Sequence, residues 1–151
     1  MSYRRSENRF QYKSLLEKDV ADHMDRQKIK YEYEADTFNY VRPSHYTPDW
    51  KVAPKRYLET KGEFSPSQRA NMLAFKEQHP DIEIIMVFAQ ASNKLHKQAK
   101  MTYAEWCDKH GIPYHDLNAV YDKKKKGYVI NNPIPRNLSS GIETTSKRRG
   151  R

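Results

Sequence analysis

The segment YTPDWKVAPKRYLETKGEF, residues 46–64, places two carboxylates and a lysine among short apolar runs. Side chains alternate between the two faces of a β-strand, so Glu59 and Lys61, two residues apart, point to the same face. Asp49 lies in the preceding run, and a short turn near APKR would bring that run antiparallel to the run that carries Glu59. Asp49 and Glu59 could then bind one divalent cation.

A cation held there would support the hydrolysis of a phosphodiester. Mg2+ prefers oxygen ligands and keeps several waters, so two carboxylates, a substrate phosphate oxygen and a backbone carbonyl, such as that of Thr60, would suffice. The ion polarises the phosphodiester and lowers the pKa of a bound water, while Lys61 can orient that water and offset the developing charge. Glu17, on a predicted helix, could complete a second cation position if the fold or a partner chain brings it near.

Each of these residues also has an ordinary structural interpretation. Asp49 after a proline is typical of a turn, and Glu59 with Lys61 is typical of an ion pair on a solvated sheet face. Ser14-x-x-Glu17 matches a capping box, in which the glutamate returns a hydrogen bond to the start of its helix. The spacing leaves both interpretations open, and for Glu17 it favours the capping box.

The composition favours a basic, soluble protein of one domain. The chain has 151 residues and a formal net charge of +9, which indicates a preference for a polyanion such as nucleic acid, although ribosomal, chromatin and membrane-surface proteins share this balance. No run approaches the roughly 18 apolar residues of a membrane span, and no signal peptide is evident, so we expect an intracellular protein without a membrane partner. Only 36% of the residues are hydrophobic, so we expect a second subunit to complete part of the core.

The cysteine and histidine content excludes several kinds of site. Cys107 is the single cysteine, which rules out an internal disulfide and a CxxC metal site and fits a reducing compartment. Its place beside Trp106 indicates a buried helical residue. The six histidines show no paired metal-binding spacing, and only His45 is near the proposed site, either beside it or as an exposed linker residue.

Hydrophobic periodicity predicts a mixed α/β fold. Helices are predicted over residues 14–27, 65–80 and 102–111, each opened by a serine or threonine. Strands are predicted over 46–52, 56–62, 82–89 and 112–117, and over 29–41 as one strand or as two broken near Asp36. Residues 1–13 are interpreted as a basic flexible arm, 14–120 as one domain with a stiff connector at RPSH, and 121–151 as a basic flexible tail.

Five blocks carry a family resemblance: SLLEKDV, HYTPDW, YLETKG, EQHPDIEIIMVF and TYAEWCDKHGIPY. In order and spacing, from about Phe10 to Leu117, the chain resembles the endonuclease I Holliday-junction resolvases of short-tailed phages of the T-seven type. This resemblance implies a PD-(D/E)xK nuclease-like fold, a mixed β-sheet flanked by helices, assembled as a domain-swapped homodimer with an extended bridge near residues 40–46. It also implies cleavage of four-way and other branched double-stranded DNA with Mg2+ or Mn2+, one or two ions per site.

By motif, the resemblance implies a set of catalytic residues and a set of metal ligands. The catalytic set is Glu17, Asp49, Glu59 and Lys61, and the metal ligands are Asp49, Glu59, Thr60 and Glu17. The family arrangement supplies Glu17 from the other chain. Two features depart from the family: EFSPSQRANM offers only Arg69 where a basic cluster is expected, and the segment after Leu117 has no recognisable counterpart.

Backbone contacts to DNA should be salt-dependent and mostly indifferent to base sequence. The candidates are basic residues of the arm and of the loop SNKLHKQAK, each of which could equally be a solvated surface charge: Arg4, Arg5, Arg9, Lys13, Lys94, Lys97 and Lys100.

We therefore expect a structure-selective endodeoxyribonuclease that resolves Holliday junctions during phage replication and packaging, acting in the cytoplasm of the host cell. Two alternatives stay open. One is a PD-(D/E)xK nuclease acting on linear, mismatched or sequence-specific DNA. The other is a basic DNA-binding protein without catalytic activity, whose acidic residues form only surface pairs.

Overall fold

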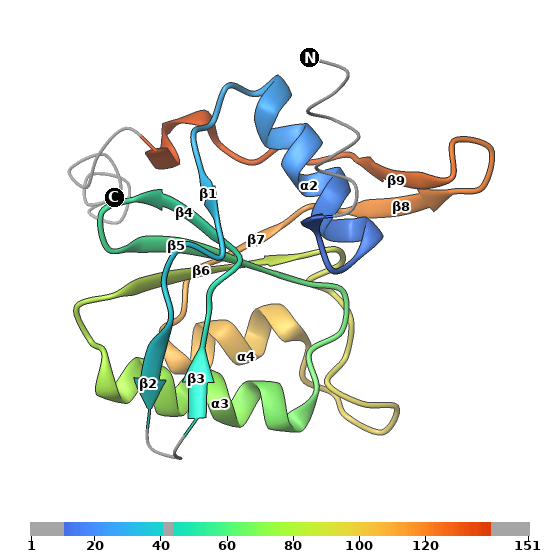
Figure 1. Ribbon diagram of the computed structural model, residues 1–151. Coiled ribbons are helices and arrows are strands. Elements are labelled where there is room, and N and C mark those ends of the chain that lie inside the picture. Colours follow the sequence, from blue (N-terminus) through green and yellow to red (C-terminus); the bar gives the residue numbers. More distant parts are fainter. Residues whose placement is uncertain (1–10, 41–43, 140–151) are drawn as a thin grey trace.

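The computed structural model describes residues 11–40 and 44–139 (Figure 1). Within these ranges the helices are α2 (Leu15–Arg26), α3 (Pro66–Gln78), α4 (Tyr103–His110) and the short 3-10 helix η1 (Arg136–Ser139). The strands are β1 (Glu32–Tyr33), β2 (Phe38–Tyr40), β3 (Ser44–Tyr46), β4 (Trp50–Ala53), β5 (Arg56–Lys61), β6 (Glu83–Phe88), β7 (Tyr114–Asp116), β8 (Ala119–Asp122) and β9 (Gly127–Ile130).

Five strands form one mixed sheet in the order β1-β4-β5-β6-β7. β4 pairs antiparallel with both β1 and β5, whereas β6 pairs parallel with both β5 and β7. Parallel neighbours need a crossover connection, and α3 and α4 provide the two crossovers. The predicted mixed α/β fold is confirmed.

The three predicted helices are confirmed, and their ends follow from local chemistry. The side chain of Ser14 accepts a hydrogen bond from the first turn of α2. Capping boxes open α3 at Ser65 and α4 at Thr102. Gly111 ends α4 with φ of 67°, a left-handed conformation that glycine adopts without a steric penalty.

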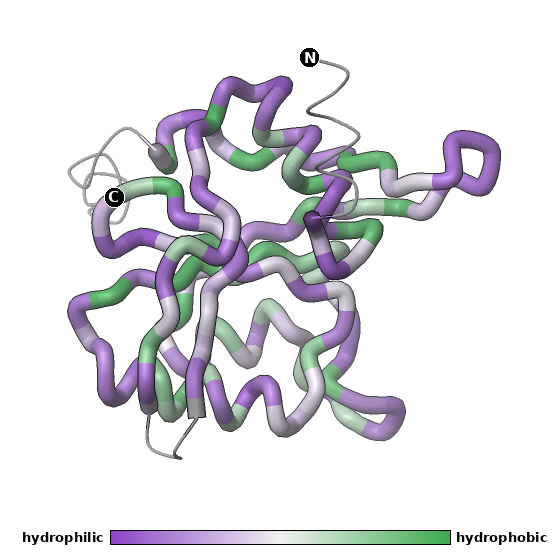
Figure 2. The backbone as a smooth tube through the Cα atoms, in the orientation of Figure 1, coloured by the Kyte–Doolittle hydropathy of each residue, from purple (hydrophilic) through white to green (hydrophobic). Residues whose placement is uncertain are grey.

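The sheet is buried on both faces. α2 covers one face, where Val20 packs in the same cluster as Leu58 of β5. α3 and α4 cover the other face, where Phe75 and Trp106 pack with Met86 of β6. Figure 2 shows the hydrophobic residues along the central strands and the hydrophilic ones at loops and hairpin tips. Burial of apolar side chains on both faces therefore fixes the positions of β5 and α2 relative to each other.

The region predicted as one or two strands before the connector forms two short strands, β1 and β2, with Asp36 between them. β2 pairs antiparallel with β3, so that Asn39 lies opposite His45. The first two residues of the predicted connector RPSH, Arg42 and Pro43, lie outside the described part of the chain, and its last two residues belong to β3. In this single chain the part of the predicted bridge that is described is thus a paired strand.

The described part of the predicted tail differs from the expectation. β8 and β9 form an antiparallel hairpin, and η1 follows it. Ile134 and Leu138 are 0% and 5% exposed, and they join the core cluster on the α2 face. These two apolar side chains hold the segment against the domain, because their burial outweighs its polar and proline-rich composition.

Candidate active site

Asp49 is fixed at the point where the chain enters β4. Its Oδ2 accepts a hydrogen bond from the backbone N–H of Thr60 at 2.8 Å. Its own backbone N–H donates to Oε1 of Glu59 at 3.3 Å. The antiparallel pairing of β4 with β5 creates this crossed pair of contacts, and it brings the two carboxylates together as the spacing predicted.

Glu59 has two side-chain partners in addition to the backbone N–H of Asp49. Its Oε1 accepts the Tyr46 hydroxyl at 2.7 Å, and its Oε2 lies 3.2 Å from Nζ of Lys61. Glu59 and Lys61 therefore share a face of β5, and the ion pair predicted as the ordinary alternative does form. The Glu59 side chain is only 6% exposed and that of Lys61 is 21% exposed, so the pair is largely buried rather than on a solvated sheet face.

Burial of the two acids raises the pKa of both. Loss of solvent, together with the nearby charges of Glu59 and Glu17, raises the pKa of Asp49 to about 9. Burial also raises the pKa of Glu59, although Lys61 and the hydroxyl of Tyr46 act in the opposite direction. The site therefore has an excess of carboxylate oxygens over nearby positive charge, an arrangement that a bound cation would relieve.

Glu17 faces this site from α2 of the same chain. Its Oε1 accepts the Tyr33 hydroxyl at 2.6 Å and the backbone N–H of Lys13 at 3.0 Å. The Ser14 hydroxyl accepts the backbone N–H of Glu17 at 3.0 Å. In a complete capping box the Glu17 carboxylate would accept the backbone N–H of Ser14, but here it accepts that of Lys13. The predicted capping box is thus only half formed. The charge of Glu17 is close enough to raise the pKa of Asp49.

Several supporting residues were not found from the sequence. The hydroxyls of Tyr33 and Tyr46 orient one acid each, and Nε1 of Trp50 donates to Oγ1 of Thr60 at 2.8 Å. Tyr33 lies opposite Trp50 in the β1–β4 register, with their rings 5.0 Å apart. The alternation in YEYE indicates which side chains share a face, but the acid that each tyrosine meets depends on how α2 and the strands pack together.

The donor set suits a hard cation. Within the described residues no group of three or more His, Cys, Asp or Glu side chains is arranged to hold a metal ion. Asp49 and Glu59 nevertheless supply adjacent carboxylates whose raised pKa values favour exchange of a proton for a cation. The N–H of Thr60 faces Asp49, and the N–H and C=O of one strand residue point the same way, so its carbonyl faces that side too. Two carboxylates and a carbonyl are suitable ligands for Mg2+.

Four of the seven predicted DNA contacts fall within the described residues. Arg4, Arg5 and Arg9 fall outside the described residues. Lys13 pairs with Glu34 at 2.7 Å, and its side chain is 71% exposed. The loop between β6 and α4 carries three exposed lysines: Lys94, Lys97 and Lys100.

The sequence also singled out His45 and Cys107. His45 is exposed on β3. Cys107 is buried in α4, as predicted, and burial raises the pKa of its thiol to about 12. Among the helices of the described residues, none is long and apolar enough to cross a membrane.

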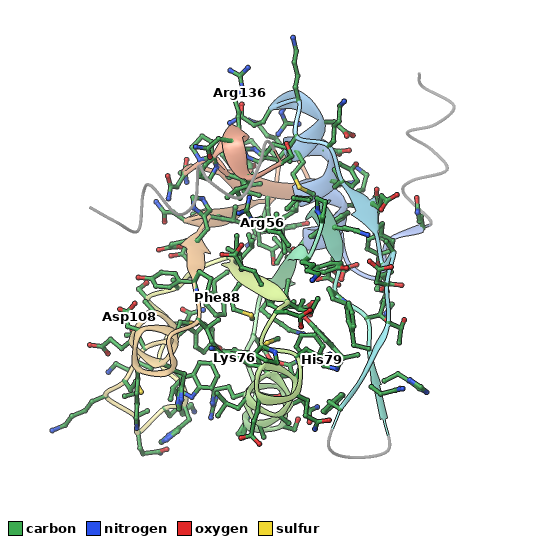
Figure 3. All side chains as sticks on the ribbon, turned by 90° about the vertical axis from the view of Figure 1, so that its left-hand side faces the viewer. Arg56, Lys76, His79, Phe88, Asp108 and Arg136 are labelled. Atoms are coloured by element: carbon green, nitrogen blue, oxygen red, sulfur yellow. The ribbon has the colours of Figure 1, made fainter. Side chains whose placement is uncertain are left out.

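A pocket of about 580 Å³ lies at the opposite end of β5 and β6, between those strands and the ends of α3 and α4. Figure 3 looks onto this end of the molecule, where the pocket residues Arg56, Lys76 and Asp108 are labelled. Arg56 is 1% exposed and its Nε pairs with Glu83 at 2.7 Å. This pocket is therefore separate from the carboxylates.

Comparison with known proteins shows the family of this chain. The family model described as Phage endonuclease I matches residues 1–131. The chain belongs to this family. It is 37% identical over 123 residues to Endonuclease I of Escherichia phage T7, covering 78% of this chain and 83% of that protein. It is also 37% identical over 108 residues to Endodeoxyribonuclease 1 of Enterobacteria phage T3, covering 70% and 71%. The family predicted from the five sequence blocks is confirmed.

Proposed function

We propose that this phage endonuclease I homologue is a structure-selective endodeoxyribonuclease that resolves Holliday junctions and other branched DNA by metal-dependent phosphodiester hydrolysis. The observation that carries the proposal is the pair of buried carboxylates, Asp49 and Glu59, joined by crossed hydrogen bonds and flanked by Lys61. A related protein from phage T3 is an endodeoxyribonuclease by name. As a phage protein, it would act in the cytoplasm of the host cell.

One or two Mg2+ or Mn2+ ions would supply Lewis acidity and an activated water when bound. Asp49, Glu59 and the carbonyl of Thr60 would hold an ion, with Glu17 placed to complete a second position. Lys61, now paired with Glu59, would turn toward the scissile phosphate, where it orients the attacking water and offsets developing negative charge.

In this proposal the tyrosines position the acids. Tyr46 holds Glu59 in one rotamer, and Tyr33 does the same for Glu17. Positions fixed in advance lower the cost of ordering the site when substrate arrives.

We further propose that two chains form a homodimer in which α2 is exchanged. A swapped dimer repeats between chains the contacts that a closed chain makes within itself, so the contacts of Glu17 would be kept. β2 and β3 are the elements that would open, and each is only three residues long. Two sites at a fixed separation would match the two strands cut across a junction.

The substrate preference is tested by comparing cleavage of a four-way junction with cleavage of its component duplexes in Mg2+. The proposal predicts paired cuts in the junction and little cutting of the duplexes. Equal rates on both substrates would instead indicate a nuclease acting on linear or mismatched DNA.

A further inference from the structure

We propose that the β8–β9 hairpin is a second DNA contact, whose lysine tip binds the phosphate backbone of a duplex arm beside the cleavage site. This inference rests on the proposed function, because it takes DNA as the substrate. It concerns residues 119–130, most of which the sequence predicted to belong to a basic flexible tail, and it assigns to them a defined surface and a partner.

The tip of the hairpin is a concentrated positive charge. Lys123–Lys126 join Asp122 of β8 to Gly127 of β9, and all four lysines are exposed. The ion pairs found among the described residues do not include any of the four. The hairpin projects from the domain in Figure 1, and its tip is strongly hydrophilic in Figure 2. Neighbouring like charges repel, so an anionic partner would stabilise this arrangement.

The tip has a defined conformation. Oδ1 of Asp122 accepts the backbone N–H groups of Lys124 at 2.9 Å and Lys125 at 3.3 Å, which closes the turn. Lys126 has φ of 53°, a left-handed conformation that glycine or asparagine would adopt at lower cost. The lysines are therefore presented from an ordered turn.

The base of the hairpin is hydrogen-bonded to the segment that follows β6 of the active-site sheet. The backbone N–H of Ala119, the first residue of β8, donates to the carbonyl of Ala89 at 2.8 Å. Ala89 in turn donates to the carbonyl of Lys61 at 3.1 Å. Two successive strand spacings therefore separate the hairpin base from Lys61, roughly 10 Å in all.

A second hydrogen bond connects the hairpin to α2, the helix that carries Glu17. The backbone N–H of Tyr128 donates to Oδ2 of Asp19, on α2, at 2.7 Å. A Cβ added at Gly127 would lie 3.1 Å from the same carboxylate oxygen, so the strand approaches α2 closely. The hairpin is therefore held by both elements that build the site, and its direction is fixed relative to them.

The reach of the hairpin matches duplex DNA. Four strand residues at about 3.3 Å each carry the tip roughly 13 Å beyond its base. The tip would then lie roughly 15–25 Å from Lys61, within the single helical turn of about 34 Å that contains the cut phosphate. Lysine ammonium groups contact phosphates without reading bases, so this contact would add affinity and orientation but no sequence preference.

The test measures binding of a four-way junction in Ca2+ as a function of NaCl concentration. The variant Lys123→Gln/Lys124→Gln/Lys125→Gln should bind at least about tenfold more weakly at low salt and lower the slope of log K against log salt by about 2–3. The matched control, Lys55→Gln/Lys76→Gln/Lys109→Gln, removes the same charge at the opposite end of the sheet and should retain the parent affinity and slope. Equal losses in both variants would show a general charge effect and overturn the inference.

Lys126→Gly distinguishes an effect of lost charge on DNA binding from an effect of lost stability. Glycine relieves the left-handed backbone, so the substitution should preserve or raise thermal stability while it lowers junction affinity and reduces the salt slope by about 1. Unchanged affinity in this variant would overturn the inference. Failure of the parent protein to bind junctions would instead reject the proposed function, since the hairpin test requires that binding.

Discussion

At the residue scale, the neighbouring buried acids Asp49 and Glu59 make folding stability depend on pH. The pKa of Asp49 is about 9 when folded, against 3.8 for an ordinary aspartate, because of burial and of the charges of Glu59 and Glu17. At this group the folded protein therefore binds more protons than the unfolded chain between about pH 4 and pH 9. Without a cation, the contribution of Asp49 to stability should fall as the pH rises through that range.

Asp49→Asn should stabilise the metal-free protein. The amide can still accept the N–H of Thr60, and it removes the charge that the fold disfavours, so we expect a gain of roughly 2 kcal/mol at pH 7–8. Denaturant unfolding in EDTA at pH 5, 7 and 9 would measure this gain, which should be smallest at pH 5. Asp36→Asn is the control with opposite sign, because the hydrogen bond from Tyr57 and the pair with Lys51 lower the pKa of Asp36. A loss of stability in Asp49→Asn at every pH would contradict the account.

Tyr46→Phe should shift the pH dependence of cleavage upward. The Tyr46 hydroxyl lowers the pKa of Glu59, so its removal should raise that pKa and require a higher pH to ionise the acid. Single-turnover junction cleavage in Mg2+ across pH 6–9 would reveal the shift. Tyr31→Phe is a control, since Tyr31 donates to Asp25 outside the site. Identical profiles for Tyr46→Phe and the parent protein would show that the hydroxyl does not tune Glu59.

At the scale of elements, most of the secondary structure follows from local sequence. Serine or threonine at the helix starts, Gly111 after α4 and the apolar run of β6 predicted those elements closely. The spacing of Glu59 and Lys61 also predicted their shared face. These features depend on backbone geometry within a few residues, which a single sequence expresses directly.

The parts that were missed depend on contacts distant in sequence. Ile134 and Leu138 enter a core built by α2 and the sheet, and their surroundings of proline, asparagine and serine gave no local sign of burial. Likewise, Tyr33 and Tyr46 meet their acids across separations of 16 and 13 residues. Strand register and tertiary packing decide such contacts, and local periodicity does not determine either.

His23 makes a pH-dependent hydrogen bond to the segment after β9. Its Nε2 accepts the backbone N–H of Ile134 at 2.9 Å, so it must be unprotonated there. Burial and the nearby Arg26 and His115 lower its pKa below 6.5, so this contribution to stability is present above about pH 6.5 and is lost as the pH falls.

We therefore expect acidification from pH 7.5 to 5.5 to speed hydrogen exchange at residues 134–139, after correction for intrinsic rates. His23→Gln should remove this dependence, because an amide oxygen can accept the same hydrogen bond without titrating. Hydrogen exchange of the parent protein and of His23→Gln, measured by mass spectrometry at both pH values, would test this expectation. An equal acceleration in His23→Gln would show that another group controls the segment.

At the scale of the whole molecule, the question is which chain supplies Glu17. In the single chain described here, Glu17 and Lys61 serve the same site, whereas an exchange of α2 would combine Glu17 of one chain with Lys61 of the other. Mixed dimers of Glu17→Gln and Lys61→Ala chains distinguish the two. With exchange, one site loses both groups and the other keeps all four, so one strand should still be nicked.

The reciprocal mixture is the control. Dimers of parent chains with Glu17→Gln/Lys61→Ala chains should lose nicking if α2 is exchanged, because each site then lacks one group. If both groups come from one chain, this mixture should nick and the first should not. That second pattern would contradict the exchange while leaving the catalytic assignment intact.

The central claim is that Asp49 and Glu59 form a metal-dependent phosphodiesterase site rather than a structural pair of buried acids. Glu59→Gln tests it most directly, through cleavage of a four-way junction in Mg2+ and binding of the same junction in Ca2+. We predict that Glu59→Gln lowers the cleavage rate by at least about 1,000-fold while junction binding stays within about threefold of the parent protein. Cleavage at the parent rate by a folded Glu59→Gln protein, or no Mg2+-dependent cleavage by the parent protein, would contradict it.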